Sequence, residues 1–443
     1  MDARNPDADV EHYGAFIPLT CRGVAAHLTA RAGDRHQRAA FARMATALRI
    51  ARHRQYLAVA EELRHAYLPF NPDRDTVREL DLSPGEIEAR RRTFAERMRR
   101  LLARANYVLL SEADINRILT SSHPFSLRVS VDLSEFENFA LFYRDVYDET
   151  LEFRRPDRLY LVRASVRVTS FRRLFLFLKL KPAERRVAEL MERHGWSERR
   201  ARRAVERRRR FLPRGTSSDF IYVKLFKTIP EYDVQILFPN RKVEFRPFDK
   251  IKFGVTAGGG TIFGLVSTSG KLAAATSPFA IAGAMAGFIM LVTRQVTKFF
   301  NQRTRYMAEL SQKLFFHNLA NNSAAIALML DRAEEEEFKE DLFALAALAG
   351  RTVPPEALAA ARASVEQDIL STFRAGVSFE IEDALSRLEA DGVARRLPDG
   401  SVAVEPVERV EAILRALVDA LDDAEARRAE AGADDGDPAL RTV

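Results

Sequence analysis

The chain of 443 residues has a single cysteine, Cys21, and a single tryptophan, Trp196. One cysteine excludes an intrachain disulfide and a cysteine-rich metal site, and we expect Cys21 to act as a small buried hydrophobe. The N-terminus lacks a basic segment followed by an apolar run, so we expect no cleaved signal peptide. No catalytic set of Ser, His and Asp, of Cys and His, or of metal-spaced ligands can be assembled. We therefore expect neither an enzyme activity nor a cofactor nor a bound metal.

Charge is scarce in one long segment. Residues 253–293 contain one charged residue, Lys271, in 41 positions, although 30% of the whole chain is charged. A helix that crosses the hydrocarbon core needs about 20 apolar residues, and Phe253–Gly270 and Leu272–Thr293 offer 18 and 22. A lysine is costly at the bilayer centre but reaches water in a turn. The pattern therefore predicts a transmembrane hairpin with Lys271 at its tip.

The first predicted span is rich in glycine. Glycines four residues apart let helix backbones approach closely, so we expect them to pack the two spans together or to join two copies of the chain. A buried hydrophobic hairpin in a soluble protein stays open as an alternative, because Gly and Ala dilute the hydrophobicity. The predicted packing positions are Gly254, Gly258, Gly260, Gly264, Gly283 and Gly287.

Basic residues flank the predicted hairpin on both outer sides. Lys250 and Lys252 precede it, and Arg294 and Lys298 follow it. Since short cytoplasmic flanks carry an excess of Lys and Arg, both termini are expected on the cytoplasmic side. The sequence thus predicts a multi-pass protein with two spans.

The chain before the hairpin divides into two regions. In residues 1–120 apolar residues recur at three- and four-residue spacing, which predicts helices. Ser83 and Glu86 suit a capping box that starts a helix at Pro84. Residues 121–252 alternate apolar and polar side chains, which predicts an α+β domain with an interrupted, mostly antiparallel sheet. The expected strands include 127–133, 159–168, 174–180, 221–226 and 234–238.

An insertion at residues 183–214 interrupts this domain. It holds twelve Arg and five Glu, a net charge of +7 that equals the charge of the whole chain, and we expect a helical hairpin around His194-Gly195. Three interpretations stay open: a solvated, partly Glu-paired helix pair, contact with anionic lipid, or nucleic-acid binding, for which aromatic residues are few. The candidate lipid contacts are Arg199, Arg200, Arg202, Arg203, Arg207, Arg208, Arg209 and Arg210.

Residues 294–353 are expected to form a helical region with an Asn-rich junction at Asn318–Asn322. The acidic run Glu334–Glu340 follows. We interpret the run as a solvated helix face. A carboxylate metal site is the less favoured alternative; its residues would be Glu336, Glu337 and Glu340, with His317 upstream.

Several segments between residues 16 and 350 resemble a known family. They are Phe16–Pro18, Tyr67–Asp73, Val223–Pro230, Leu237–Pro239, the two-span hairpin and Asn318–Glu340. The chain resembles the uncharacterised membrane-protein family that includes transmembrane protein 143. This resemblance implies two membrane spans and supplies no biochemical activity.

Residues 354–421 predict a winged-helix-like domain. Helices are expected at 355–372 and 379–391, followed by a hairpin whose turn is Asp399-Gly400. The second helix is strongly acidic and would repel DNA phosphates, so we expect protein contact there, by dimerisation or by docking on the protein's own helices. Residues 422–443 are expected to be a disordered tail.

Together the patterns predict an α+β membrane protein. Its expected parts are a helical N-terminal region, the sheet domain, the transmembrane hairpin, a helical stalk and the winged-helix-like domain. The leading hypothesis is a membrane-anchored scaffold or regulatory protein that self-associates. A subunit of an oligomeric pore or transport assembly is the alternative, and an enzyme in the α+β domain is third. Expected partners are membrane lipids, a second copy and a protein bound to the winged-helix-like domain; nucleic acid is not expected.

Overall fold

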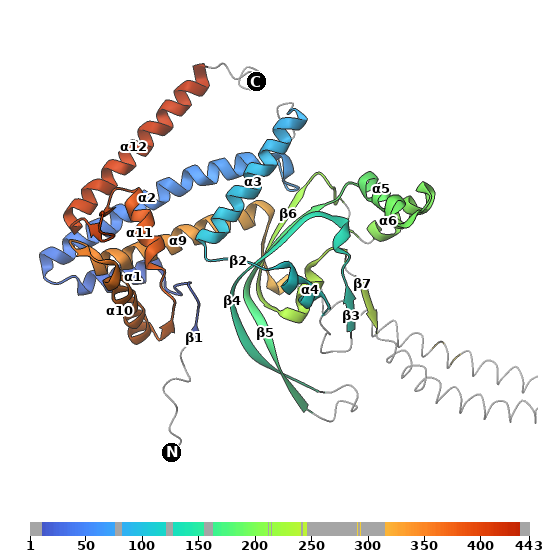
Figure 1. Cartoon of the computed structure of the whole chain (residues 1–443), viewed down its shortest axis with the longest axis horizontal. Helices are drawn as coiled ribbons and strands as arrows, with labels where there is room; N and C mark the ends of the chain where they lie inside the picture. Colours follow the sequence, from blue (N-terminus) through green and yellow to red (C-terminus); the bar gives the residue numbers. More distant parts are fainter. Residues whose placement is uncertain are drawn as a thin grey trace, which may run out of the picture.

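The computed structural model describes residues 11–75, 82–120, 127–154, 163–210, 212–213, 215–240, 242–245, 290, 293 and 315–434. The fold class is α+β. Most helices gather on one side of the molecule, the large sheet lies beside them, and the helix pair within residues 183–209 lies beyond the sheet (Figure 1). Two long helices, α2 (Arg35–Tyr67) and α9 (Asn322–Leu348), run between these two parts and contact each other.

The prediction of a two-span membrane protein is wrong for the described part of the chain. None of the helices within the described ranges combines the length and the apolar character that a membrane crossing requires. The long helix α2 carries charged residues along most of its length, and in α9 the charged residues fill the middle, at 331–341, so neither helix offers about 20 consecutive apolar residues. The membrane fold class and the multi-pass localisation fail with it. Of segment 253–293 only Met290 and Thr293 are described, so Lys271 and all six glycine packing positions lie outside the described residues.

The large sheet is antiparallel, with five strands in the order β2-β4-β5-β6-β8. Its centre consists of the long strands β4 (Phe136–Arg154) and β5 (Arg163–Leu180), with β6 (Ile221–Pro230) beside β5. The short strands β2 (Val108–Leu109) and β8 (Asn318–Asn321) form the edges. Aromatic and β-branched residues are frequent in the central strands, as strands favour.

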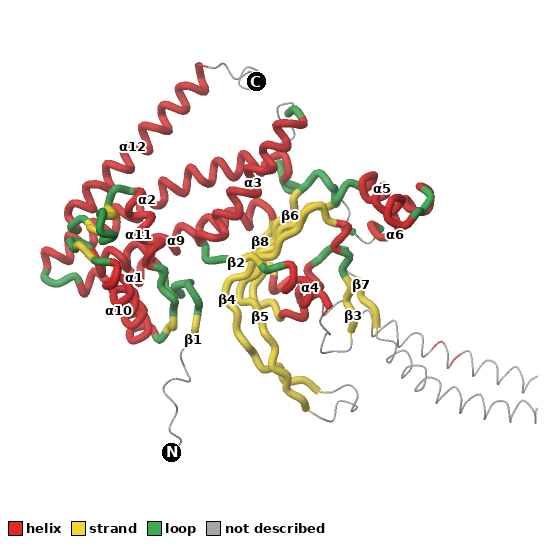
Figure 2. The backbone as a smooth tube through the Cα atoms, in the orientation of Figure 1, coloured by secondary structure: helices red, strands yellow, loops and turns green. Residues whose placement is uncertain are grey.

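Three adjacent strands of this sheet are distorted at the same level. Asp145 on β4 and Thr228 on β6 have φ angles of +68° and +52°, and Arg172 on β5 lies between them. A positive φ at a residue other than glycine is uncommon and changes the direction of the following side chains. Accordingly Phe226 and Ile229 of β6, which lie on either side of Thr228 and three positions apart, face the same core. On β5, Phe171 and Leu174 are also three positions apart and face this core. Beyond this level β4 and β5 continue as a two-stranded ribbon that leaves the body of the molecule (Figure 2).

Both faces of the sheet are covered. On one face lie α2, α9 and α3 (Pro84–Arg104), which bury Phe142 and Phe175 of the sheet. On the other face lie α4 (Glu112–Thr120) and the 3₁₀ segment η5 (Glu231–Leu237). The strand predicted at 234–238 is therefore wrong. Prolines bracket this segment, and since proline lacks an N–H donor it does not extend a ladder.

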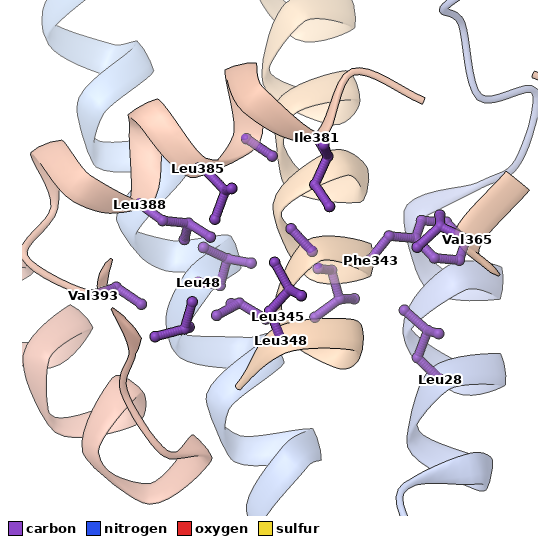
Figure 3. Packing of buried hydrophobic residues seen from close by; sticks show 14 of the residues in the cluster. Leu28, Leu48, Phe343, Leu345, Leu348, Val365, Ile381, Leu385, Leu388 and Val393 are labelled. Atoms are coloured by element: carbon purple, nitrogen blue, oxygen red, sulfur yellow. The ribbon is translucent and has the colours of Figure 1, made fainter. Parts of the chain in front are cut away.

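A second core joins the N-terminal helices to the C-terminal elements. It packs α1 (Cys21–Arg31), α2 and the second half of α9 against α10 (Pro355–Phe373), α11 (Ile381–Ala390) and α12 (Val407–Asp434). Figure 3 shows Leu28, Leu48, Phe343, Leu345, Leu348, Val365, Ile381, Leu385, Leu388 and Val393 meeting in this core. The core runs across the predicted boundary at residue 354, so the C-terminal elements do not stand apart.

These C-terminal elements follow the order of a winged helix. After α9 come β9 (Thr352–Val353), α10 and α11, and then the hairpin of β11 (Ala394–Arg396) and β12 (Val402–Val404). The three strands form one antiparallel sheet in the order β11-β12-β9. The predicted Asp399-Gly400 turn connects β11 and β12, and Gly400 has the φ of +83° that such a turn requires. The helix predicted to dock on the protein's own stalk, α11, does pack against α9.

Smaller elements complete the described chain. β1 (Glu11–His12) pairs in parallel with β10 (Ala375–Gly376), and β3 (Leu127–Ser130) pairs with β7 (Lys242–Phe245). A 3₁₀ turn, η2 (Leu68–Phe70), ends α2 at the predicted proline break, and η3 (Leu133–Glu135) precedes β4. Helix α12 continues to Asp434, so the first part of the predicted disordered tail is helical.

Two local predictions about helices are confirmed. At the start of α3, the Ser83 N–H donates to Glu86 Oε2 at 2.7 Å and the Glu86 N–H donates to Ser83 Oγ at 3.3 Å, which is the expected capping box. The arginine-rich insertion is a helical hairpin of α5 (Ala183–His194) and α6 (Glu198–Arg209). Gly195 ends α5 with a φ of +62°, a conformation that glycine adopts without strain.

Candidate functional site

One face of the central strands carries a ladder that changes from cationic to aromatic and back to cationic. This is the face covered by α3, and its members are cross-strand neighbours on β4 and β5. Neighbouring side chains on one face of an antiparallel pair interact directly. The successive pairs are Asn138 with Lys179, Ala140 with Phe177, Phe142 with Phe175, and Arg144 with Arg173.

A pocket of about 250 Å³ lies between α3 and the first three pairs of this ladder. The volume is slightly below the ~300–1,000 Å³ that is typical of sites for drug-sized ligands. The lining comprises Arg91, Arg92, Ala95, Met98, Arg99 and Leu102 of α3, Asn138, Phe139, Ala140 and Phe142 of β4, Phe175, Phe177 and Lys179 of β5, and Ile221 of β6.

The floor of the pocket is aromatic and held in place from below. The rings of Phe142 and Phe175 meet edge to face at 6.4 Å between centroids, and Phe177 lies 6.2 Å from Phe94 of α3. Phe94 in turn stacks on Tyr67 at 4.7 Å. Phe175 and Phe94 are completely buried. Such ring contacts are favourable beyond simple burial, so the floor is a fixed apolar surface.

The rim of the pocket is basic. Arg91 is held by two hydrogen bonds to Glu88, at 2.8 Å from Nε and 2.7 Å from Nη2. Arg92 and Arg99 are exposed, and neither has a carboxylate within 4 Å among the residues that the structure describes. Two unpaired guanidinium groups at the mouth of an apolar pocket favour a ligand with an apolar body and a negative group.

The acidic run on α9 is buried, which corrects the prediction of a solvated helix face. Glu336 and Asp341 are 0% exposed. Asp341 accepts hydrogen bonds from Arg52 Nε of α2 at 2.6 Å and from Arg387 Nε of α11 at 2.9 Å. Lys339 Nζ lies 2.8 Å from Glu336 Oε2. Buried charges are tolerated when they are paired, and α9 collects its partners from α2 and α11 as well as from itself.

The C-terminal end of α3 joins this buried network. Arg104 donates to both carboxylate oxygens of Glu337, at 2.5 and 2.8 Å. Asn106, just beyond the helix, donates to Glu340 Oε1 at 3.2 Å. Burial raises the pKa of Glu340 to about 8, although the attraction of Arg387 opposes the shift. The helix that covers the pocket is therefore tied to the core of the helical part.

The metal alternative for the acidic run finds no support. In the described stretches no three His, Cys, Asp or Glu side chains are arranged to hold a metal ion. Glu337 and Glu340 bind arginine and amide donors instead, and His317 lies elsewhere, with Nδ1 2.8 Å from the Lys227 carbonyl oxygen.

The arginines predicted to contact lipid lie on α6 and at its C-terminal end. Arg202 pairs with Glu198 at 3.0 Å, and Arg208 and Arg209 lie beside Asp132 and Glu135. Arg200 lies over the Trp196 ring, 4.6 Å from its centroid. The other four are exposed and have no carboxylate within 4 Å in the described parts of the chain: Arg199, Arg203, Arg207 and Arg210.

The pocket residues were not found from the sequence. Residues 139–143 form a short apolar run rich in aromatic residues, which is typical of a strand. The pocket depends on the pairing of β4 with β5 and on the position of α3 over this pair. Both depend on long-range contacts, which cannot be derived from the pattern of a single sequence. The predicted arginine run on α6 does not line the pocket, which takes its cations from α3 and β5 instead.

Residues 136–324 match the model of a protein family of unknown function, DUF3754. The matched region is less than half of the chain; it includes β4, β5 and β6 and thus most of the pocket floor, and it excludes α3. No solved structure matches the chain.

Proposed function

We propose that this protein binds small amphipathic anions in the pocket between α3 and the sheet. The observation that carries the proposal is the combination, in one pocket, of a packed phenylalanine floor with the unpaired cations Arg92 and Arg99 at its mouth. The ligand class is a short acyl or aromatic body with a carboxylate or phosphate head. Because α3 also binds Glu337 in the buried network, a ligand that stabilises α3 has a direct connection to the helical part.

The apolar part of the ligand follows from the floor. Four phenylalanines and one methionine line the cavity. Removing apolar surface from water contributes roughly 25 cal/mol per Å², so an eight-carbon chain has enough surface for measurable affinity. The head group follows from the rim, because guanidinium groups pair with carboxylate and phosphate through directed hydrogen bonds.

Titration calorimetry with eight-carbon probes tests this proposal. Octyl phosphate and octanoate are expected to bind, octanol to bind more weakly and octylammonium to bind least, because only the head group differs. Equal affinity for all four probes would show a hydrophobic surface without charge selection and would contradict the proposal.

Three variants localise the binding: Ala140→Leu and Arg99→Glu change residues that line the pocket, and Arg100→Glu is a control. Ala140→Leu places a larger side chain in the cavity, since Ala140 is half-buried and lines it, and is expected to abolish octanoate binding. Arg100→Glu is the matched control for the rim: Arg100 is exposed on α3 and does not line the pocket. If Arg100→Glu weakens octanoate binding as much as Arg99→Glu does, the pocket assignment fails.

Self-association is a second candidate function, favoured by the two-stranded ribbon. Beyond Ser170, β5 has no pairing with β6, so both outer edges of the ribbon are without a strand partner among the described residues. Val146 at its base is 43% exposed. Free edges of this kind can pair with another chain. Light scattering of the full chain and of a variant in which Asn-Gly replaces residues 148–169 tests this candidate; a monomer in both would exclude it.

A further inference from the structure

The other cationic end of the ladder lies outside the pocket. Arg144 on β4 and Arg173 on β5 are direct cross-strand neighbours. Like charges in such a position are destabilising. Neither arginine has a carboxylate within 4 Å in the described part of the chain. The repulsion between these two arginines therefore calls for a compensating interaction.

Arg144 is buried and incompletely satisfied. Arg144 is only 6% exposed, and its Nη1 has no hydrogen-bond partner among the residues that the structure describes. The guanidinium carbon lies 3.9 Å from the centroid of the Phe16 ring and 5.3 Å from that of Tyr107. Rings attract a guanidinium through its face, while its N–H donors point outward in the plane. The aromatic contacts therefore orient Arg144 without using its donors.

The carboxylates nearby are engaged with other cations. Asp145 Oδ2 lies 2.8 Å from Arg172 Nε, and Glu336 Oε2 lies 2.8 Å from Lys339 Nζ. Glu336 also accepts from the Ile17 N–H at 2.6 Å. The protein thus supplies these acids to neighbouring groups rather than to Arg144 or Arg173.

The charged form of Arg173 is disfavoured in these surroundings. Burial lowers the pKa of its guanidinium first, and repulsion from Arg144, Arg332 and Arg172 lowers it further. Arg173 Nη1 donates to the Arg172 carbonyl oxygen at 2.8 Å, which leaves its other donors free of carboxylate partners. Uncompensated buried charge of one sign is expensive, and an external anion would offset it.

We infer that Arg144 and Arg173 form a binding site for a tetrahedral oxyanion of the phosphate class. Arg144 and Arg173 lie on adjacent strands and directly opposite each other, and guanidinium N–H donors recognise phosphate. The anion is either free inorganic phosphate or the terminal phosphate of a phosphomonoester. This site lies one pair beyond the pocket floor on the same ladder and does not depend on the function proposed above.

Phosphorus NMR of the full chain tests the site. The ³¹P resonance of inorganic phosphate is expected to broaden when the protein is added. Chloride keeps the ionic strength the same in all samples. Arg173→Gln is the primary variant because Arg173 is only half-buried, and it should weaken phosphate binding at least tenfold. It should also unfold at the same or a higher temperature than the unaltered chain in the absence of phosphate, because it removes repulsion. Arg144→Gln should weaken binding similarly.

The control and the probes decide between outcomes. Arg203→Gln removes an exposed, unpaired arginine of α6 and should leave phosphate binding unchanged. Methyl phosphate, compared with inorganic phosphate, identifies the source: tighter methyl phosphate binding supports a phosphomonoester, and tighter phosphate binding supports the free ion. Absence of broadening in the unaltered chain, or equal broadening with Arg173→Gln, would overturn the site.

Discussion

α3 and α6 have the same number of arginines, seven each, and different surroundings. α3 buries Phe94, Met98, Leu101 and Leu102. α6 buries only Ala201 and Val205, in a small cluster shared with α5. The large apolar face holds α3 against the sheet, where its arginines meet a pocket and a buried carboxylate. The small face leaves most arginines of α6 in solvent.

The two helices show that the surroundings of an arginine depend on how its helix packs. A helix with a large apolar face is held against the protein, and its arginines then contact protein groups instead of water. Net charge marked the insertion 183–214, which includes α6, as the distinctive basic element, because it holds twelve Arg against five Glu. Arg92, Arg99 and Arg104 of α3 lie at an apolar pocket or on a buried glutamate. These positions give a guanidinium group chemistry that solvent does not provide.

The largest expected effect is the loss of Arg104. Arg104→Ala leaves Glu337, which is 1% exposed, without its bidentate partner. Breaking a buried pair costs about 3 kcal/mol or more, and we expect that loss in the free energy of unfolding measured with urea. The matched change on α6, Arg207→Ala, removes an exposed arginine and should change stability by less than ~0.5 kcal/mol. Equal effects at both positions would remove the distinction between the helices.

The next effect concerns pH at the end of α3. The pKa of Glu340 is raised to about 8 in the folded chain. Between the ordinary pKa of a glutamate and about pH 8, the carboxyl group is therefore protonated in the folded state and ionised in the unfolded state. Its contribution to the free energy of unfolding therefore falls as pH rises from about 5 to about 8. The expected fall is at least ~1.4 kcal/mol, the equivalent of one pKa unit. Glu340→Gln should flatten this slope in urea titrations, and an unchanged slope would contradict the assignment.

The third effect is on ligand binding. Arg99→Glu places a negative charge at the mouth of the pocket and should weaken octanoate binding about tenfold, equivalent to ~1.4 kcal/mol. Arg203→Glu on α6 makes the same charge change away from the pocket. It should leave the affinity within a factor of two in calorimetry at moderate salt, where distant charges are screened. A parallel loss in both variants would indicate a nonspecific electrostatic effect.

The smallest effect is expected on the solvated face of α6. Arg199, Arg203 and Arg207 lie at four-residue spacing, are exposed and have no carboxylate within 4 Å in the described ranges. Changing all three to Gln should alter the unfolding temperature by no more than about 2 °C, since exposed charges contribute little to stability. A larger destabilisation would show that this face packs against a part of the protein or a second copy.

The sequence predicted local elements better than their partners. The capping box at Ser83, the hairpin around Gly195 and the turn at Asp399-Gly400 are set by a few adjacent residues, and all three are present. The 234–238 segment looked like a strand because its apolar residues alternate, but the flanking prolines favour the 3₁₀ segment η5.

The main error of the sequence-based prediction concerns which charged residues are buried. The run Glu334–Glu340 looks solvated because a single sequence shows its charges and not their partners. Glu337 binds Arg104 of α3 and Glu340 binds Arg387 of α11, while Arg52 of α2 binds the adjacent Asp341. The low charge of 253–293 led to the membrane prediction, and the described helices do not contain a spanning segment. The pocket depends on the register of β4 with β5, which periodicity alone does not reveal.

Hydrogen–deuterium exchange of the full chain with and without octanoate tests the central proposal most directly. If the pocket binds amphipathic anions, octanoate will slow exchange in α3 and in the segments of β4 and β5 that line the cavity, and exchange in α5 and α6 will stay unchanged. Slower exchange confined to α5 and α6, or no change in α3 at saturating octanoate, would contradict the proposal.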